Sequence, residues 1–158
     1  MSANLRAFLY AIAFSELGPD LLAQSDNGYD VIVGSRPGKL DRFTTYRAHP
    51  HKLVKVMIKG REVASTAAGR YQILGRYADH YMRKLGLRDF GPHAQDQIAI
   101  QMIRECRALE DVEAGRFAEA IRKCRSRWAS LPGAGYDQHE NSLIALQNAF
   151  VLAGGTLA

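Results

Sequence analysis

A glutamate occupies a position in the first predicted helix where a core residue would be expected. The apolar face of that helix contains Leu5, Phe8, Leu9 and Ile12, and Glu16 falls at the next position of the same face. Burial disfavours a charged carboxylate, and so does the negative end of the helix dipole, so we expect a raised pKa. A carboxyl group that keeps its proton near neutral pH can act as a general acid. From spacing alone, a glutamate that turns outward at a fraying helix end is the alternative.

The elements that would position this glutamate begin with a helix over 5–16. Asn4 is a good N-cap, and Gly18 and Pro19 stop the helix. Two short β-branched runs follow at 30–33 and 53–58, which predicts a small antiparallel sheet. Four further helical patterns cover 71–85, 92–109, 112–128 and 139–153, with Pro92 in a first-turn position. The pattern predicts a single α+β domain over 1–158, mainly helical, with a small antiparallel β lobe and a cleft between lobes.

The composition is that of an ordinary globular domain. The chain has 158 residues, of which 47% are hydrophobic and 23% charged. Cys106 and Cys124 fall in apolar helical patterns, so we expect buried, inert thiols and not a disulfide framework. We find no signal peptide pattern and no apolar run long enough to span a membrane.

Positive charge is concentrated in one segment. Between Arg36 and Arg61 there are eight Lys and Arg against one acidic residue, Asp41, which gives this segment a charge of +7. The remainder of the chain carries −2, so the net charge is +5. Such a segment attracts polyanions such as nucleic acid, a membrane surface or an anionic wall polymer. A solvated basic face that only aids solubility is the alternative.

Six strings of residues, in order and spacing, resemble the lysozyme superfamily and, within it, the lambda-type phage endolysins. They lie at 15–16, 27–34, 49–54, 66–72, 85–90 and 128–136, and include Asn-Gly-Tyr-Asp-Val-Ile-Val-Gly and Trp-Ala-Ser-Leu-Pro-Gly-Ala-Gly-Tyr. The resemblance implies a lysozyme-like fold and a murein lytic transglycosylase. It assigns Glu16 as the catalytic residue, which protonates the glycosidic oxygen between N-acetylmuramic acid and N-acetylglucosamine. The muramoyl 6-hydroxyl then attacks the anomeric carbon and leaves a 1,6-anhydro end.

A hydrolase would need a second carboxylate. Related phage muramidases place an aspartate and a threonine where this sequence has Ser25 and Val31. Asp26 and Asp30 are near, so a two-carboxylate muramidase is an alternative, although we expect Asp30 to fix a turn.

The resemblance also places residues in the sugar-binding cleft. Tyr71 and Gln72 follow a glycine that we expect to open a helix, and glutamine suits an N-acetyl group. Tyr29 and Tyr136 are further candidates on the same logic. For Tyr71, a core ring is the alternative, and Trp128 is expected in the core.

Other functions have weaker support. His49 and His51 lack further zinc ligands, so we expect no metal and no cofactor. A non-enzymatic polyanion-binding module is the alternative from another class, but no nucleic-acid recognition motif is present. The expected partners are murein glycan strands, with no nucleic acid and no stable membrane insertion. We expect a monomer that stays in the host cytoplasm until a separate membrane-permeabilising protein releases it to the periplasm.

Overall fold

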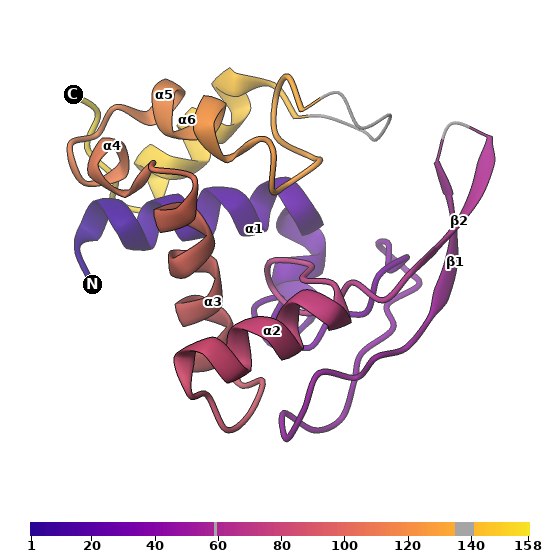
Figure 1. Ribbon diagram of the computed structural model, residues 1–158. Coiled ribbons are helices and arrows are strands. Elements are labelled where there is room, and N and C mark those ends of the chain that lie inside the picture. The colour runs from indigo at the N-terminus through magenta and orange to yellow at the C-terminus, as the bar shows by residue number, and fades with distance from the viewer. Residues whose placement is uncertain (59, 135–140) are drawn as a thin grey trace. The chain divides into compact units, whose positions relative to one another are not determined.

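The computed structural model describes residues 1–58, 60–134 and 141–158. This part of the chain contains six helices and one two-stranded antiparallel sheet (Figure 1). The elements are α1 (Ala3–Gln24), β1 (Val54–Ile58), β2 (Arg61–Ser65), α2 (Gly75–Leu85), α3 (Pro92–Glu105), α4 (Leu109–Glu113), α5 (Phe117–Cys124) and α6 (Leu143–Leu152). The predicted α+β, mainly helical class is confirmed.

The chain divides into two compact units. Unit 1 consists of Met1–Glu16 and Ala99–Ala158, and unit 2 of Leu17–Ile98. Helix α1 is interrupted at Gly18, whose φ of 78° and ψ of 164° are not helical. The predicted break is therefore confirmed, but the chain becomes helical again from Pro19, which suits the start of a helix.

Aromatic rings form the core of unit 1. Phe117 of α5 lies between two others, 5.8 Å from Phe8 and 4.9 Å from Phe150, measured between ring centroids. Asn4 donates to the carbonyls of Glu113 and Thr156 and accepts from the Thr156 N–H. These bonds hold the start of α1 against the segment that follows α6.

The sheet of unit 2 differs from the predicted one. The run at 53–58 does form a strand, but its partner is β2, with Val56 opposite Val63. The predicted strand at 30–33 forms only isolated bridges, from Val31 to Arg42 and from Ile32 to Ala68. Figure 1 shows β1 and β2 side by side as a narrow ribbon. Every residue of the two strands is exposed or half-buried.

Several helix boundaries also differ, because residues with left-handed backbone interrupt the predicted patterns. Gln72 has a φ of 48°, so the helix predicted from Tyr71 begins only at Gly75. Arg107 has a φ of 57° and Gly115 a φ of 76°, which separate α3, α4 and α5. The last predicted helix spans Leu143–Leu152, with the Ser142 hydroxyl accepting from the Ala145 N–H, a common N-cap.

The two cysteines are free, and only one of them is where the sequence placed it. Cys124 is buried at the end of α5. Cys106 is half-buried and lies in the turn after α3, because that helix ends at Glu105. The prediction of a buried helical thiol is therefore wrong for Cys106.

The turn at 69–72 is held by a fully buried glutamine on α3. Gln95 Oε1 accepts from the Arg70 N–H at 2.9 Å, and its Nε2 donates to the carbonyls of Tyr29 and Phe90 at 2.9 Å each. A Cβ at Gly69, whose φ is 83°, would lie 2.2 Å from that Oε1. No side chain larger than hydrogen fits while these bonds are kept.

We therefore predict that Gly69→Ala lowers the free energy of unfolding by about 2 to 4 kcal/mol, since it adds both backbone strain and an overlap with Gln95. The matched control is Gly38→Ala, which has a similar φ of 80° but nothing within 4 Å of the added Cβ. The control should lose only about 1 to 2 kcal/mol. Urea unfolding of both variants measures the difference, and equal losses would contradict the packing argument.

Candidate active site

Glu16 lies in the last turn of α1 before the break at Gly18. The apolar residues of its face, Leu5, Phe8, Leu9 and Ile12, are all buried. Glu16 itself is half-buried, and its carboxyl group is removed from water. Desolvation raises the pKa of Glu16 from 4.5 to about 7, although a hydrogen bond from Ser130 acts in the opposite direction. The predicted raised pKa is supported, with burial as its largest cause.

The Ser130 hydroxyl donates to Glu16 Oε1 at 3.0 Å. Because a hydroxyl has one proton, Ser130 Oγ must accept in its second contact, the 2.8 Å bond with Ser15 Oγ. Asn141 Nδ2 in turn donates to Ser15 Oγ at 3.2 Å. The donors therefore run in one direction, from Asn141 through Ser15 and Ser130 to Glu16, and each bond strengthens the next.

Two backbone contacts hold this chain of donors in place. Asn141 Nδ2 also donates to the Ser15 carbonyl at 3.0 Å, and the Asn141 N–H donates to the Ser130 carbonyl at 3.0 Å. Ser15 and Ser130 are both buried. The carboxyl of Glu16 is thus oriented by a rigid, internally satisfied network within unit 1.

A second polar cluster lies within unit 2, around Asp96 of α3. Its Oδ1 accepts from the Tyr29 hydroxyl at 2.9 Å and from the Tyr71 hydroxyl at 2.6 Å. The Arg70 guanidinium lies 5.1 Å from the Tyr29 ring centre and 5.9 Å from that of Tyr71. Burial and the charge of Asp96 both raise the pKa of each tyrosine, so both hydroxyls stay protonated and donate.

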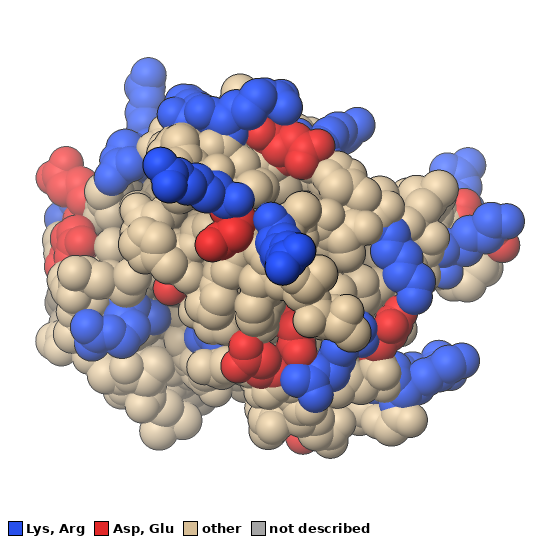
Figure 2. All heavy atoms as spheres, turned by 90° about the horizontal axis from the view of Figure 1, so that it is seen from below, with Lys and Arg blue, Asp and Glu red and all other residues tan. Residues whose placement is uncertain are grey.

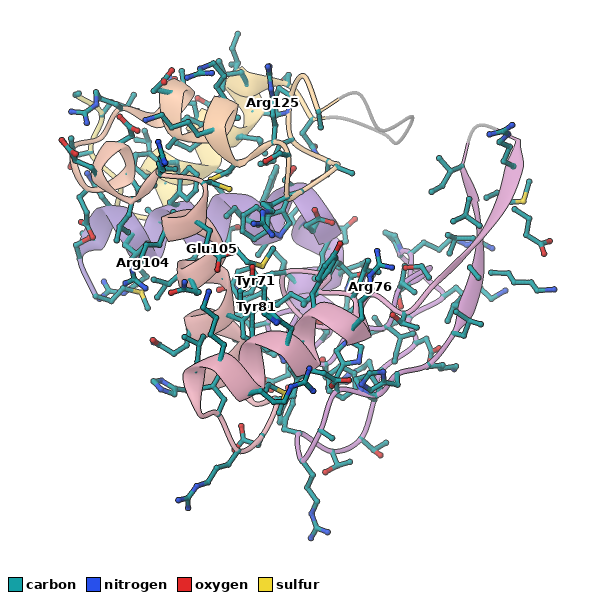
Figure 3. The ribbon with its side chains drawn as sticks, viewed as in Figure 1. Tyr71, Arg76, Tyr81, Arg104, Glu105 and Arg125 are labelled. Atoms are coloured by element: carbon teal, nitrogen blue, oxygen red, sulfur yellow. The ribbon has the colours of Figure 1, made fainter. Side chains whose placement is uncertain are left out.

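The predicted sugar-binding residues have different surroundings. Tyr29 is half-buried, whereas Tyr71, labelled in Figure 3, is buried with only 1% of its surface exposed. Gln72 is half-buried, and its Nε2 donates to the carbonyls of Gly69 at 2.9 Å and Val31 at 3.3 Å. Tyr136 lies outside the described residues. Sugar contact by these residues stays a prediction.

The two aspartates considered as second catalytic carboxylates are both engaged in structural bonds. Asp30 is buried, accepts from the Asp26 N–H at 3.0 Å and pairs with Arg42 at 2.6 Å. The expected turn-fixing role of Asp30 is confirmed by these contacts. The Asp26 carboxylate accepts from the Tyr46 hydroxyl at 2.5 Å.

The histidine pair also has structural partners. His49 is buried, its Nε2 meets the Ile73 carbonyl at 2.8 Å, and its Nδ1 accepts from the His51 N–H at 3.0 Å. Burial lowers the pKa of His49, which favours its neutral form. His51 pairs with Asp79 at 3.0 Å. In the described part of the chain, no group of three or more His, Cys, Asp or Glu is arranged to hold a metal ion.

Part of the basic segment is neutralised locally. Lys52 pairs with Asp41 at 2.7 Å and Lys55 with Glu62 at 3.3 Å, in addition to the pair made by Arg42. Figure 2 shows Lys and Arg side chains spread over the face seen from below, with Asp and Glu between them.

None of the helices in the described residues has the length and apolar character of a membrane span.

Sequence reasoning missed Ser130, Asn141 and Asp96. Ser130 and Asn141 are more than 110 residues from Glu16 in the chain, and no periodicity connects them. A signal did exist for the α3 cluster, since Gln95 falls in line with Ile98, Ala99 and Met102 on the buried face of that helix. A polar residue in such a position requires buried hydrogen-bond partners.

The comparisons with known proteins agree with the geometry. The family model described as Endolysin matches residues 6–157. The chain is 46% identical to the endolysin of Escherichia phage P2, with 98% of this chain and 95% of the relative covered. It is 47% identical to the endolysin of Escherichia phage lambda, over 96% and 92% of the two chains.

A solved structure titled bacteriophage lambda lysozyme complexed with a chitohexasaccharide matches with a TM-score of 0.90 and 44% identity, covering 100% of this chain and 98% of the other. A second structure of lysozyme from bacteriophage lambda matches with a TM-score of 0.84. Fold and site therefore define a cell-wall glycosidase of the lysozyme type. The chain belongs to the phage endolysin family.

We predict that Ser130→Ala moves the alkaline limb of the pH–activity profile upward by roughly one pH unit, because the lost hydrogen bond stabilised the ionised form of Glu16. Turbidity clearing of outer-membrane-stripped bacteria from pH 5 to 9 measures the limb. Ser130→Thr, which keeps a hydroxyl, should restore the original position. Ser35→Ala, which removes a hydroxyl bonded within unit 2, is the control for lost stability alone. An unchanged alkaline limb in Ser130→Ala would refute the role of Ser130 in lowering the pKa of Glu16.

A second prediction concerns stability. Below about pH 4.5 Glu16 is protonated in both folded and unfolded states, whereas between 4.5 and about 7 the unfolded state ionises first and the folded state is penalised. Glu16→Gln removes this penalty and should be more stable than wild type by about 2 to 3 kcal/mol at pH 8, with no such gain at pH 4. Thermal unfolding at both pH values measures it. Glu62→Gln on the exposed β2 is the control, and a gain independent of pH would contradict the burial argument.

Proposed function

We propose that this endolysin is a murein lytic transglycosylase in which Glu16 acts alone. The observation that carries the proposal is a single carboxyl group, desolvated so that its pKa is about 7 and oriented by one hydroxyl donor. Near neutral pH a substantial fraction of such a group is protonated, as a general acid requires, and the remainder is ionised, as a base requires.

In the first step Glu16 donates its proton to the glycosidic oxygen between N-acetylmuramic acid and N-acetylglucosamine, and the bond from the anomeric carbon to that oxygen breaks. In the second step the 6-hydroxyl oxygen of the muramoyl residue attacks the anomeric carbon and its proton passes to Glu16. The products are a 1,6-anhydromuramoyl end and a free 4-hydroxyl, and the enzyme returns to its starting protonation state. An internal nucleophile has a high effective concentration, so no base is needed to activate water.

The bonds made by the two aspartates that follow Glu16 in the sequence support this mechanism. Asp30 is committed to Arg42 and to the backbone, and Asp26 is committed to Tyr46. Both carboxylates thus take part in hydrogen bonds that hold local structure. A two-carboxylate muramidase is the outcome that the experiment below separates.

Glycan recognition is proposed for the predicted sugar-binding residues Tyr29, Gln72 and Tyr136, with Tyr71 in a supporting role. Because the Nε2 of Gln72 is held by two backbone carbonyls, its Oε1 is fixed as an acceptor for the N–H of an N-acetyl group. Tyr29 presents part of its ring, and Tyr71 supports it by holding Asp96 from within the core. The similar structure of lambda lysozyme in complex with a chitohexasaccharide supports an N-acetylated glycan as the ligand. Tyr136 is proposed on the family resemblance.

The cellular route is also a proposal. Family membership supports synthesis in the host cytoplasm, release by a separate membrane-permeabilising protein and action on periplasmic murein as a monomer. The net charge of +5 favours approach to an anionic wall.

The test is digestion of purified murein in water enriched in heavy oxygen. We expect 1,6-anhydromuramoyl ends with no label at the anomeric carbon, because the attacking oxygen comes from the sugar. A known hydrolytic muramidase in the same water provides the labelled, borohydride-reducible standard. Labelled reducing ends as the main initial product would overturn the transglycosylase mechanism in favour of hydrolysis. Glu16→Gln should form no product of either kind above background while remaining folded.

A further inference from the structure

The two cysteines lie at the carboxyl-terminal ends of two helices of unit 1. Cys106 directly follows α3, and its N–H donates to the Met102 carbonyl at 3.0 Å, as in a last helical turn. Cys124 is the last residue of α5. Both are free, and nothing in the glycosidase chemistry uses them.

Their thiols are in contact. The Cys124 side chain is hydrogen-bonded to the sulfur of Cys106. Interactions on both sides hold the same two segments together: Glu105 pairs with Arg127 at 3.2 Å, and Lys123 Nζ donates to the Arg107 carbonyl at 3.2 Å. Glu105, labelled in Figure 3, marks the end of α3. Bonds from residues adjacent in sequence therefore hold the two cysteine-bearing segments side by side.

The two thiols differ in exposure and in the direction of their pKa shifts. Cys106 is half-buried, and its sulfur also meets the Ser126 and Arg127 side chains; the hydrogen bond from Cys124, followed by the charge of Arg127, lowers the pKa of Cys106. Cys124 is fully buried, and its pKa is raised chiefly by the same hydrogen bond and then by burial. Once the Cys106 sulfur is no longer a thiolate, it no longer accepts this hydrogen bond, and the largest cause of the raised pKa of Cys124 is removed.

We propose that Cys106 and Cys124 form a redox site in which a small-molecule or protein disulfide oxidises the pair to an intramolecular disulfide, with Cys106 as the attacking thiol and Cys124 as the resolving thiol. The site stands apart from the proposed glycosidase mechanism, since neither cysteine touches Glu16 or its donors among the described contacts.

The chemistry balances as two exchange reactions. The Cys106 thiolate attacks one sulfur of the oxidant disulfide and expels the other as a thiolate, which takes up the proton that Cys106 lost. Cys124 then loses its proton, attacks the Cys106 sulfur and expels the second oxidant thiolate, which is protonated in turn. The protein loses two electrons and two protons, and the oxidant disulfide becomes two thiols.

The bond would join the end of α3 to the end of α5 and close a loop that contains α4. A link of this length restricts the unfolded chain and stabilises the folded one. The oxidised state would therefore be a more heat-resistant form of the same fold.

The experiment treats the full-length protein with oxidised glutathione and measures intact mass, peptide maps and the unfolding temperature. Wild type is expected to lose two hydrogen atoms with no glutathione attached, and to give one cross-linked peptide pair containing Cys106 and Cys124. Its Tm should rise by roughly 5 to 10 °C and return on reduction.

Two matched variants separate the roles of the thiols. Cys124→Ser should stop at one glutathione adduct on Cys106, and Cys106→Ser should remain unmodified while folded because Cys124 is buried. The proposal is overturned if wild type keeps both thiols reduced, or if it retains as much glutathione adduct on Cys106 as the Cys124→Ser variant does. It is also overturned if disulfides form between molecules in place of the internal one. The wild-type mass and peptide map decide the question even if a variant fails to fold. Murein digestion measured in both redox states shows separately whether Glu16 chemistry is affected.

Discussion

The structure depends on the cost of removing one carboxyl group from water. Glu16 sits on the buried face of α1, where an ionised side chain is unfavourable, and only one hydroxyl donor offsets that cost. A stronger set of donors would lower the pKa of Glu16 and remove the proton that the proposed reaction needs. No donor at all would leave the group unoriented. A single neutral hydroxyl, itself fixed by Ser15 and Asn141, satisfies both requirements.

In unit 2, two adjacent polar residues on α3 hold the neighbouring loops through hydrogen bonds. Gln95 is fully buried and fixes the backbone of the 69–72 turn, while Asp96 receives the hydroxyls of Tyr29 and Tyr71. The irregular loops that carry the proposed sugar contacts are thus attached to a regular helix. Rigid loops of this kind can present Gln72 in one orientation, which an N-acetyl group requires for recognition.

The sequence was most informative where a periodic pattern met an exception. The position of Glu16 on an apolar face, the break at Gly18 and the first-turn Pro92 were all predicted, because each depends on neighbours within a few residues. The late start of α2 and the separation of α3 from α4 were not, because Gln72 and Arg107 adopt left-handed backbone that such residues rarely favour. The partners of Glu16 and the partner of β1 were missed for a different reason. Long-range pairing is set by the folded chain as a whole, and β2 has too few buried apolar residues to be recognised as a strand.

The order of segments in unit 1 has a consequence for synthesis on the ribosome. Unit 2 is one continuous stretch, Leu17–Ile98, whereas unit 1 combines the first sixteen residues with the stretch from Ala99 onward. Phe8 therefore emerges from the ribosome long before Phe117, its ring partner in the core of that unit, and Glu16 long before Ser130 and Asn141. Domains fold as their residues become available, so unit 2 can close first and the first half of α1 must wait. Glu16 receives its orienting hydrogen bond only after Ser130 has been synthesised, and a nascent chain arrested before that point carries the glutamate without the environment that raises its pKa.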